Sequence, residues 1–136
     1  MKLQYALLSN AAFSATSAGF IALNPQLLSI EIQLLPIYWQ VIALGLGGFA
    51  VQLLMMAGVL ITQSSWVRLV LKLTPSVIIA DIAWVLGSLA LALIFNDLIS
   101  GLGFALIIAI NVCVGSLALL QYLGLKKDPA VKNTAG

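Results

Sequence analysis

The chain has 136 residues, of which 62% are hydrophobic and only 7% are charged, and its formal net charge is +2. A soluble domain carries about 25% charged residues, so this composition excludes a water-facing globular surface and predicts an integral membrane protein. The sequence contains no histidine and a single cysteine, Cys113. We therefore expect no metal site, no cofactor and no internal disulfide, and the small net charge indicates no nucleic-acid partner.

Four apolar stretches are each long enough to cross a bilayer, which takes about 20 residues in a helix. Asn24-Pro25 ends the first stretch, because a residue before proline is displaced from the helical conformation. Pro36 begins the second, because proline suits the first turn of a helix. The prediction is a single all-α membrane domain over 1–136, a bundle of four transmembrane helices, with a polar tail at 126–136. The predicted spans are residues 4–23, 36–62, 76–95 and 98–125.

The distribution of Lys and Arg predicts the orientation. All six cations fall at the two termini or in the middle loop, at Lys2, Arg68, Lys72, Lys126, Lys127 and Lys132. Glu31 and Asp97 are the only charges in the other two loops. The excess of cations on the cytoplasmic side of membrane proteins therefore predicts a multi-pass protein with both termini in the cytoplasm.

Two connections carry patterns of their own. Residues 64–75 place Arg68 and Lys72 on one helical face, which fits either a short interfacial helix or the first turns of the third span with a kink at Pro75. Residues 28–34 alternate between apolar and polar side chains, which is a strand pattern. An unpaired strand is costly at a membrane, so we favour an interfacial helix there unless a partner chain pairs with the strand.

Spans one and three share a sequence pattern. Residues 10–17 align without gaps on residues 81–88, and Gly48-Phe49-Ala50 of span two repeats as Gly103-Phe104-Ala105 in span four. The pattern predicts two duplicated helical hairpins related by an axis along the membrane normal. Chance similarity between apolar helices is the alternative.

Asp81 is the strongest candidate for a functional residue. An ionisable group within a span is costly and by default marks a functional site. Helix lengths place Asn10 and Gln121 at a similar depth, and each has an amide that can donate to a carboxylate. The predicted ligand- or proton-binding cluster consists of Asp81, Asn10, Trp84, Gln121, Ser14 and Ser88.

Two structural explanations compete with this prediction. The cluster could be a hydrogen-bonded tether that fixes helix register, or Asp81 could pair with Arg68 or Lys72 extending from the inner loop. Nearer the midplane we expect a secondary polar set of Ser17, Gln52 and Asn111, for which hydrogen bonding between helices is the ordinary explanation.

The chain carries four short motifs, which are Asn10-x-x-Phe13-Ser14, Gly45-Leu46-Gly47 with Phe49-Ala50, Asp81-x-x-Trp84-Val85-x-x-Ser88, and Gln121-x-x-Gly124-Leu125-Lys126. Together they resemble the pattern of a loose group of small bacterial four-span integral membrane proteins. The resemblance covers most of the chain and implies a bacterial inner membrane and one four-helix unit, but no activity. The chain is also similar in size to small multidrug transporters, which place an essential glutamate in the first span. Span one here has only Asn10 and hydroxyls, which argues against that family.

The sequence favours a transport-type bundle that binds a small ligand, a proton or a cation at Asp81. The alternative is a structural or accessory subunit of a larger membrane complex. In either case the expected partners are the lipid bilayer and a second copy or a larger complex. A membrane enzyme is disfavoured, and no catalytic residue is assigned, because the chain lacks histidine, a second cysteine and paired carboxylates within its spans.

Overall fold

The structure, a computed structural model, describes residues 2–134 and is all-helical in that range, with four long apolar helices that could each span a membrane. The predicted all-α bundle of four long apolar helices is thereby confirmed. The helices are α1 (Leu3–Leu23), α2 (Pro25–Glu31), α3 (Pro36–Thr62), α4 (Val67–Ile94), the 3₁₀ turn η1 (Asn96–Leu98), α5 (Gly101–Lys127) and α6 (Pro129–Thr134).

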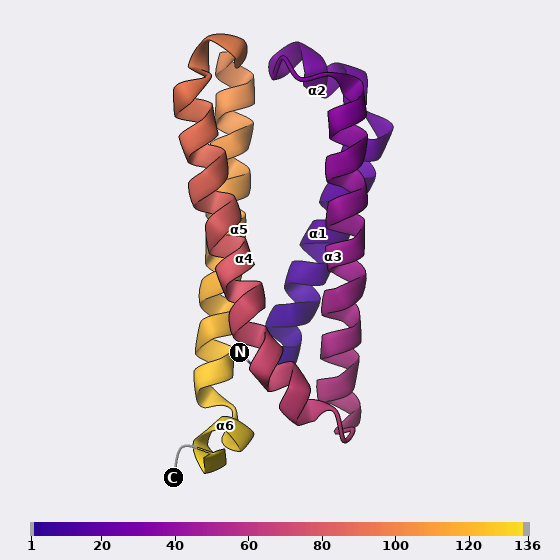
Figure 1. The fold of residues 1–136 in the computed structure, drawn as a ribbon, viewed down its shortest axis with the longest axis vertical. Coiled ribbons are helices and arrows are strands. Elements are labelled where there is room, and N and C mark those ends of the chain that lie inside the picture. The colour runs from indigo at the N-terminus through magenta and orange to yellow at the C-terminus, as the bar shows by residue number, and fades with distance from the viewer. Residues whose placement is uncertain (1, 135–136) are drawn as a thin grey trace.

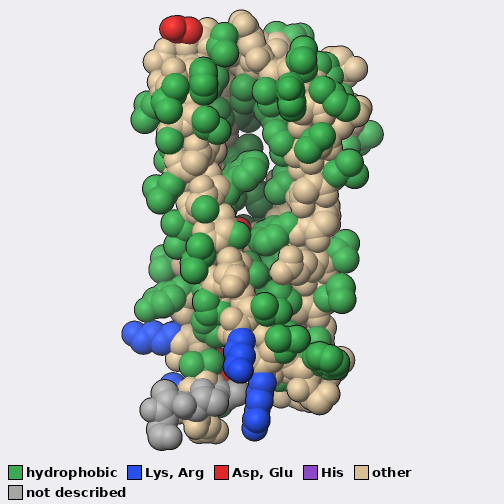
Figure 2. All heavy atoms as spheres, viewed as in Figure 1, with side chains coloured by type: hydrophobic (Ala, Val, Ile, Leu, Met, Phe, Trp, Pro, Cys, Tyr) green, Lys and Arg blue, Asp and Glu red, His purple; other side chains and the backbone are tan. Residues whose placement is uncertain are grey.

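The bundle consists of two helical hairpins. Figure 1 shows α1 beside α3 and α4 beside α5, with the two pairs converging toward the lower end of the view. The start of α1 and the end of α5 lie toward this end. Figure 2 shows Lys and Arg side chains gathered at that same end, which we call the cationic end.

Helix α4 begins well before the predicted third span, at Val67 rather than at residue 76, and Pro75 lies inside it. The residues from Val67 to Pro75 are therefore the first turns of the helix, not a separate interfacial helix. Proline lacks the N–H that would bond to the carbonyl four residues earlier. Thr74, the residue before this proline, adds a hydrogen bond within these first turns, because its buried hydroxyl donates to the carbonyl of Val70 at 2.8 Å.

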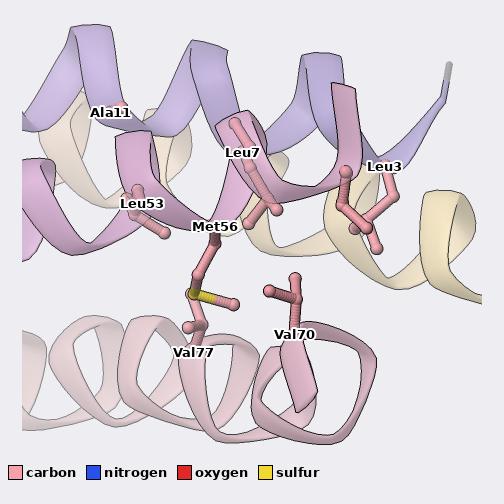
Figure 3. Packing of buried hydrophobic residues seen from close by; sticks show 9 residues of the cluster. Leu3, Leu7, Ala11, Leu53, Met56, Val70 and Val77 are labelled. Atoms are coloured by element: carbon pink, nitrogen blue, oxygen red, sulfur yellow. The ribbon is translucent and has the colours of Figure 1, made fainter. Parts of the chain in front are cut away.

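The apolar core lies at the cationic end, where α1, α3 and α4 converge. In Figure 3, Met56 of α3 points toward Val77 of α4. Helix α5 joins this end through Gly124, where an added Cβ would come within 2.8 Å of the Leu3 Cα atom of α1. The two hairpins are thus packed backbone against backbone at this point. The core residues are Leu3, Leu7, Ala11, Leu53, Met56, Ala57, Leu60, Val70 and Val77.

At the opposite end the hairpins make a second contact, which we call the clasp. Residues of the predicted 28–34 segment form helix α2 and then a single antiparallel bridge from Ile32 to Ile99. The Ser100 amide donates to the Glu31 carbonyl at 2.8 Å, and the Ser100 hydroxyl donates to the Glu31 carboxylate. An added Cβ at Gly103 would lie 2.6 Å from the Glu31 carbonyl oxygen. Most of the segment is therefore a helix, which is the structure that we favoured for it. Its last residues pair with the loop around Ile99 of the same chain.

Candidate functional site

Asp81 is buried near the middle of α4. It lies 14 residues after Val67 in a helix of 28 residues, which places it about 21 Å from the start of the helix. Only 5% of its surface is exposed. Because α4 begins earlier than predicted, Asp81 is closer to the middle of its helix than a span beginning at residue 76 implies.

Two amides from the other helices donate to the carboxylate of Asp81. The Asn10 Nδ2 atom of α1 lies 2.8 Å from Asp81 Oδ2, and the Gln121 Nε2 atom of α5 lies 3.3 Å from the same oxygen. Asn10 and Gln121 are 1% and 0% exposed, respectively. The structure therefore brings together three residues that the sequence placed at a common depth, and it joins α1, α4 and α5 at one carboxylate.

Within the part of the chain that the structure describes, no ion pair balances this carboxylate. Among residues 2–134, the two amides are the hydrogen-bond partners of Asp81, and no Lys or Arg is paired with it. Arg68 and Lys72 are exposed on the first turns of α4, and Lys72 lies about 13 Å along the helix from Asp81. The expected alternative in which one of these cations neutralises Asp81 does not hold in this conformation.

The Gln121 side chain has one polar atom without a partner. Its Nε2 atom is used by Asp81, whereas its Oε1 atom is buried and forms no hydrogen bond within residues 2–134. A buried acceptor without a donor is costly. This carbonyl oxygen and the carboxylate of Asp81 belong to side chains in direct contact, and oxygen atoms of these two types are ligands of protons and hard cations.

The other residues of the predicted cluster have different positions. The Ser14 hydroxyl donates to Asn10 Oδ1 at 3.3 Å and so holds the amide that contacts Asp81. The Ser88 hydroxyl donates instead to Asn111 Oδ1 at 2.9 Å. Trp84 is 42% exposed, so the structure does not bring its indole into the cluster.

The predicted secondary polar set does not form one group. Asn111 is buried, and its Nδ2 atom has no partner among the described residues. Ser17 is half-buried on α1, whereas Gln52 is exposed on α3. Within the described residues, Asn111 is the member of this set that takes part in a hydrogen bond between helices, accepting from the Ser88 hydroxyl.

The contact between Glu31 and Ser100 was not foreseen. The sequence predicts that the last span begins at residue 98, whereas in the structure Ser100 is the N-cap of α5 and accepts from the Gly103 amide at 2.9 Å. A serine directly before an apolar helix is a usual N-cap signal, and it could have located this helix start. Nothing in the sequence pairs Ser100 with Glu31, which is 69 residues away.

Asp81 lines neither of the two surface grooves. One, of about 350 Å³, runs between α4 and α5 and is lined by Ile78, Ile82, Val85, Leu86, Gly115, Ala118, Leu119 and Tyr122. The other, of about 560 Å³, lies between α1 and α3 and is lined mainly by small and apolar residues, among them Gly19, Ala43 and Gly47. Both linings are mainly apolar, so the polar cluster is the better candidate site.

Comparison of the chain with protein-family models, with curated proteins and with solved structures gave no match.

Proposed function

We propose that this protein is a small transport-type membrane protein that binds a proton or a monovalent cation at Asp81. The observation that carries the proposal is a buried carboxylate that receives two amide hydrogen bonds but has no cation beside it. A charge in this environment is expensive unless it is neutralised. A bound proton or cation would neutralise it.

The ligand is expected to be monovalent because the site holds one carboxylate. The other acidic residues, Glu31, Asp97 and Asp128, lie at the ends of helices or between them. Ca²⁺ takes six to eight oxygen ligands, often from several carboxylates. The single carboxylate of Asp81 and the carbonyl oxygen of Gln121 therefore suit a monovalent ligand better than a divalent cation.

The surroundings of Asp81 favour access from the clasp side. Toward the cationic end lie the apolar core and the close contact of Gly124 with Leu3. Toward the clasp, polar side chains continue along the helices at Ser14 and at the Ser88–Asn111 pair. Figure 2 also shows a hollow between the two hairpins in the half of the molecule away from the cationic end. Rocking of one hairpin against the other about the Asp81 contact would then change the side of the membrane from which a ligand reaches Asp81, as in transporters built from repeats.

We also propose that the cationic end faces the cytoplasm of a bacterium and that the protein resides in the inner membrane. The support is the gathering of Lys and Arg at one end of the bundle, which is the usual sign of the cytoplasmic side.

A flux measurement tests the proposed function. The full chain is reconstituted in lipid vesicles, gradients of protons, Na⁺ and K⁺ are applied in turn, and Asp81→Asn is compared with Asp97→Asn. Asp97 provides a matched control, because it undergoes the same chemical change at an exposed position in the loop before α5. Asp81→Asn is expected to reduce the flux to that of empty vesicles, with Asp97→Asn unchanged. Equal flux in the wild type and both variants, or none from any gradient, would instead favour a structural or accessory subunit in which the cluster is a tether.

A further inference from the structure

The groove between α4 and α5 is an open apolar channel on the surface of the second hairpin. Its volume is about 350 Å³, and its lining includes Ile82 and Leu86 of α4 and Gly115, Leu119 and Tyr122 of α5. The four large side chains among these five residues are all exposed, so the groove is open along its length. We call it the α4–α5 groove.

The groove ends one helical turn before a lysine. Tyr122 is the lining residue nearest the end of α5, and Lys126 follows four residues later on the same helix face, about 6 Å farther along. Gly115, at the other end of the lining, is about 16.5 Å from Lys126. Half of a hydrocarbon layer is about 15 Å thick. The groove therefore occupies the depth of one leaflet, and Lys126 lies at the level of that leaflet's headgroups.

The charge at this level favours an anion. Lys126 is exposed and forms no ion pair within residues 2–134. It belongs to the cationic end, where the six Lys and Arg residues of the chain are accompanied by one acid, Asp128. A lysine can lay its stem along apolar surface and extend its ammonium group to the phosphates. The hydroxyl of Tyr122 is a further donor for the same headgroup.

The width of the groove favours a hydrocarbon chain as its occupant. The lining from Gly115 to Tyr122 is about 10.5 Å long, so a volume of about 350 Å³ corresponds to a mean cross-section of about 33 Å². A helix with its side chains is about 10 Å wide, which is about 80 Å² in section. The groove therefore suits a single acyl chain better than a helix of another protein.

The other surface groove has no cation at its ends. It lies between α1 and α3 toward the clasp, with Gly19 and Gly47 in its lining. No Lys or Arg occurs between residues 3 and 67, a range that includes both of these helices, and Glu31 lies in α2 between them. An anionic headgroup would find no cation there, so this groove provides a control.

We propose that the α4–α5 groove binds one acyl chain of an anionic phospholipid whose phosphate contacts Lys126. The site does not depend on what Asp81 binds, because Asp81 does not line the groove. A lipid in this position would contact both helices that carry the hydrogen bond between Gln121 and Asp81.

Native mass spectrometry of the full chain in detergent tests the headgroup contact. The fraction of protein with one lipid bound is measured with phosphatidylglycerol and with phosphatidylcholine of the same acyl chains. One lysine is worth about a fivefold preference for the anionic lipid. Lys126→Gln is expected to lose this preference, whereas Lys132→Gln, which removes the same charge from α6, keeps it. Equal binding of the two lipids by the wild type, or equal effects of the two variants, would overturn the proposal.

Filling each groove in turn tests the acyl-chain contact. Gly115→Leu is compared with Gly47→Leu, the same change in the α1–α3 groove. A Cβ atom at either glycine would meet nothing within 4 Å, so both variants are expected to fold, which circular dichroism checks. Gly115→Leu is expected to lower phosphatidylglycerol binding to the level of phosphatidylcholine, with Gly47→Leu unchanged. Equal effects of the two variants would contradict the proposal. Displacement of the lipid by glycerol phosphate, which has no acyl chain, would identify a phosphate site instead.

Discussion

The amide of Asn10 donates to the carboxylate of Asp81 across the interface between the two hairpins, with 2.8 Å between Nδ2 and Oδ2. These two residues also hold the same place in the aligned segments 10–17 and 81–88. The contact places the carboxylate of Asp81, deep within α4, at the junction of the two hairpins.

A double-mutant cycle measures the strength of this contact. Asn10→Ala and Asp81→Ala are expected to be coupled by about 0.6–1.7 kcal/mol, the range observed for hydrogen bonds between membrane helices. The measurement is the free energy of unfolding in mixed detergent micelles for the two single variants and the double variant. A control cycle of Asn10→Ala with Asn111→Ala is expected to be additive, because these side chains have different partners. Additivity in the Asn10–Asp81 cycle would show that the contact contributes no stability.

The close approach of α5 to α1 predicts opposite effects at two glycines of one helix. A Cβ atom at Gly124 would meet the Leu3 backbone at 2.8 Å, whereas a Cβ atom at Gly115 would meet nothing within 4 Å. Gly124→Ala is therefore expected to lower the free energy of unfolding by about 1–3 kcal/mol through overpacking. Gly115→Ala should raise it by up to about 1 kcal/mol through helix propensity. The same unfolding experiment compares them, and similar values for the two variants would argue against the backbone contact.

The clasp makes Ser100, the N-cap of α5, more important for stability than Ser116 within the helix. Its hydroxyl caps the helix at the Gly103 amide and also donates to the Glu31 carboxylate. Ser100→Ala is expected to destabilise the protein by about 1–2 kcal/mol. It should also speed amide hydrogen exchange at Gln33, which donates to the neighbouring Leu98 carbonyl.

Ser116→Ala is the matched control for this prediction, since Ser116 is exposed and bonds only to the Val112 carbonyl of its own helix. It should leave both stability and exchange unchanged. Unaltered exchange at Gln33 in the Ser100 variant would mean that the loops stay joined without the serine.

Much of the fold could be predicted because membrane helices have a strong local signal. The second predicted span coincides with α3 from Pro36 to Thr62, since proline marks its start and apolar residues continue to its end. The start of α4 was harder, because Arg68 and Lys72 resemble an interfacial segment and Pro75 usually ends a helix. Here the buried side chains of Val70 and Thr74 hold the first turns against the bundle.

The site could be predicted only to the extent that polar residues at the same depth in the membrane come into contact. Asn10, Asp81 and Gln121 lie at one level, and each is costly in lipid, so their meeting could be expected. Trp84 was misplaced because a spacing of three residues leaves it about 60° around the helix from Asp81, which is enough to turn a large ring toward lipid. The sequence carries no such signal for the packing between hairpins, because an apolar side chain is equally well accommodated against lipid tails and against another helix.

The most direct test of the central claim is difference infrared spectroscopy of Asp81 in a bilayer, with Asp81→Asn subtracted from the wild type. The spectra are recorded while the pH is titrated and while Na⁺, K⁺ and Li⁺ are exchanged. A binding site predicts that the Asp81 carboxyl or carboxylate bands change reversibly with pH or with the identity of the monovalent cation. Bands that stay the same at every pH and in every salt would contradict this account and would identify the Asn10–Asp81–Gln121 cluster as a tether between helices.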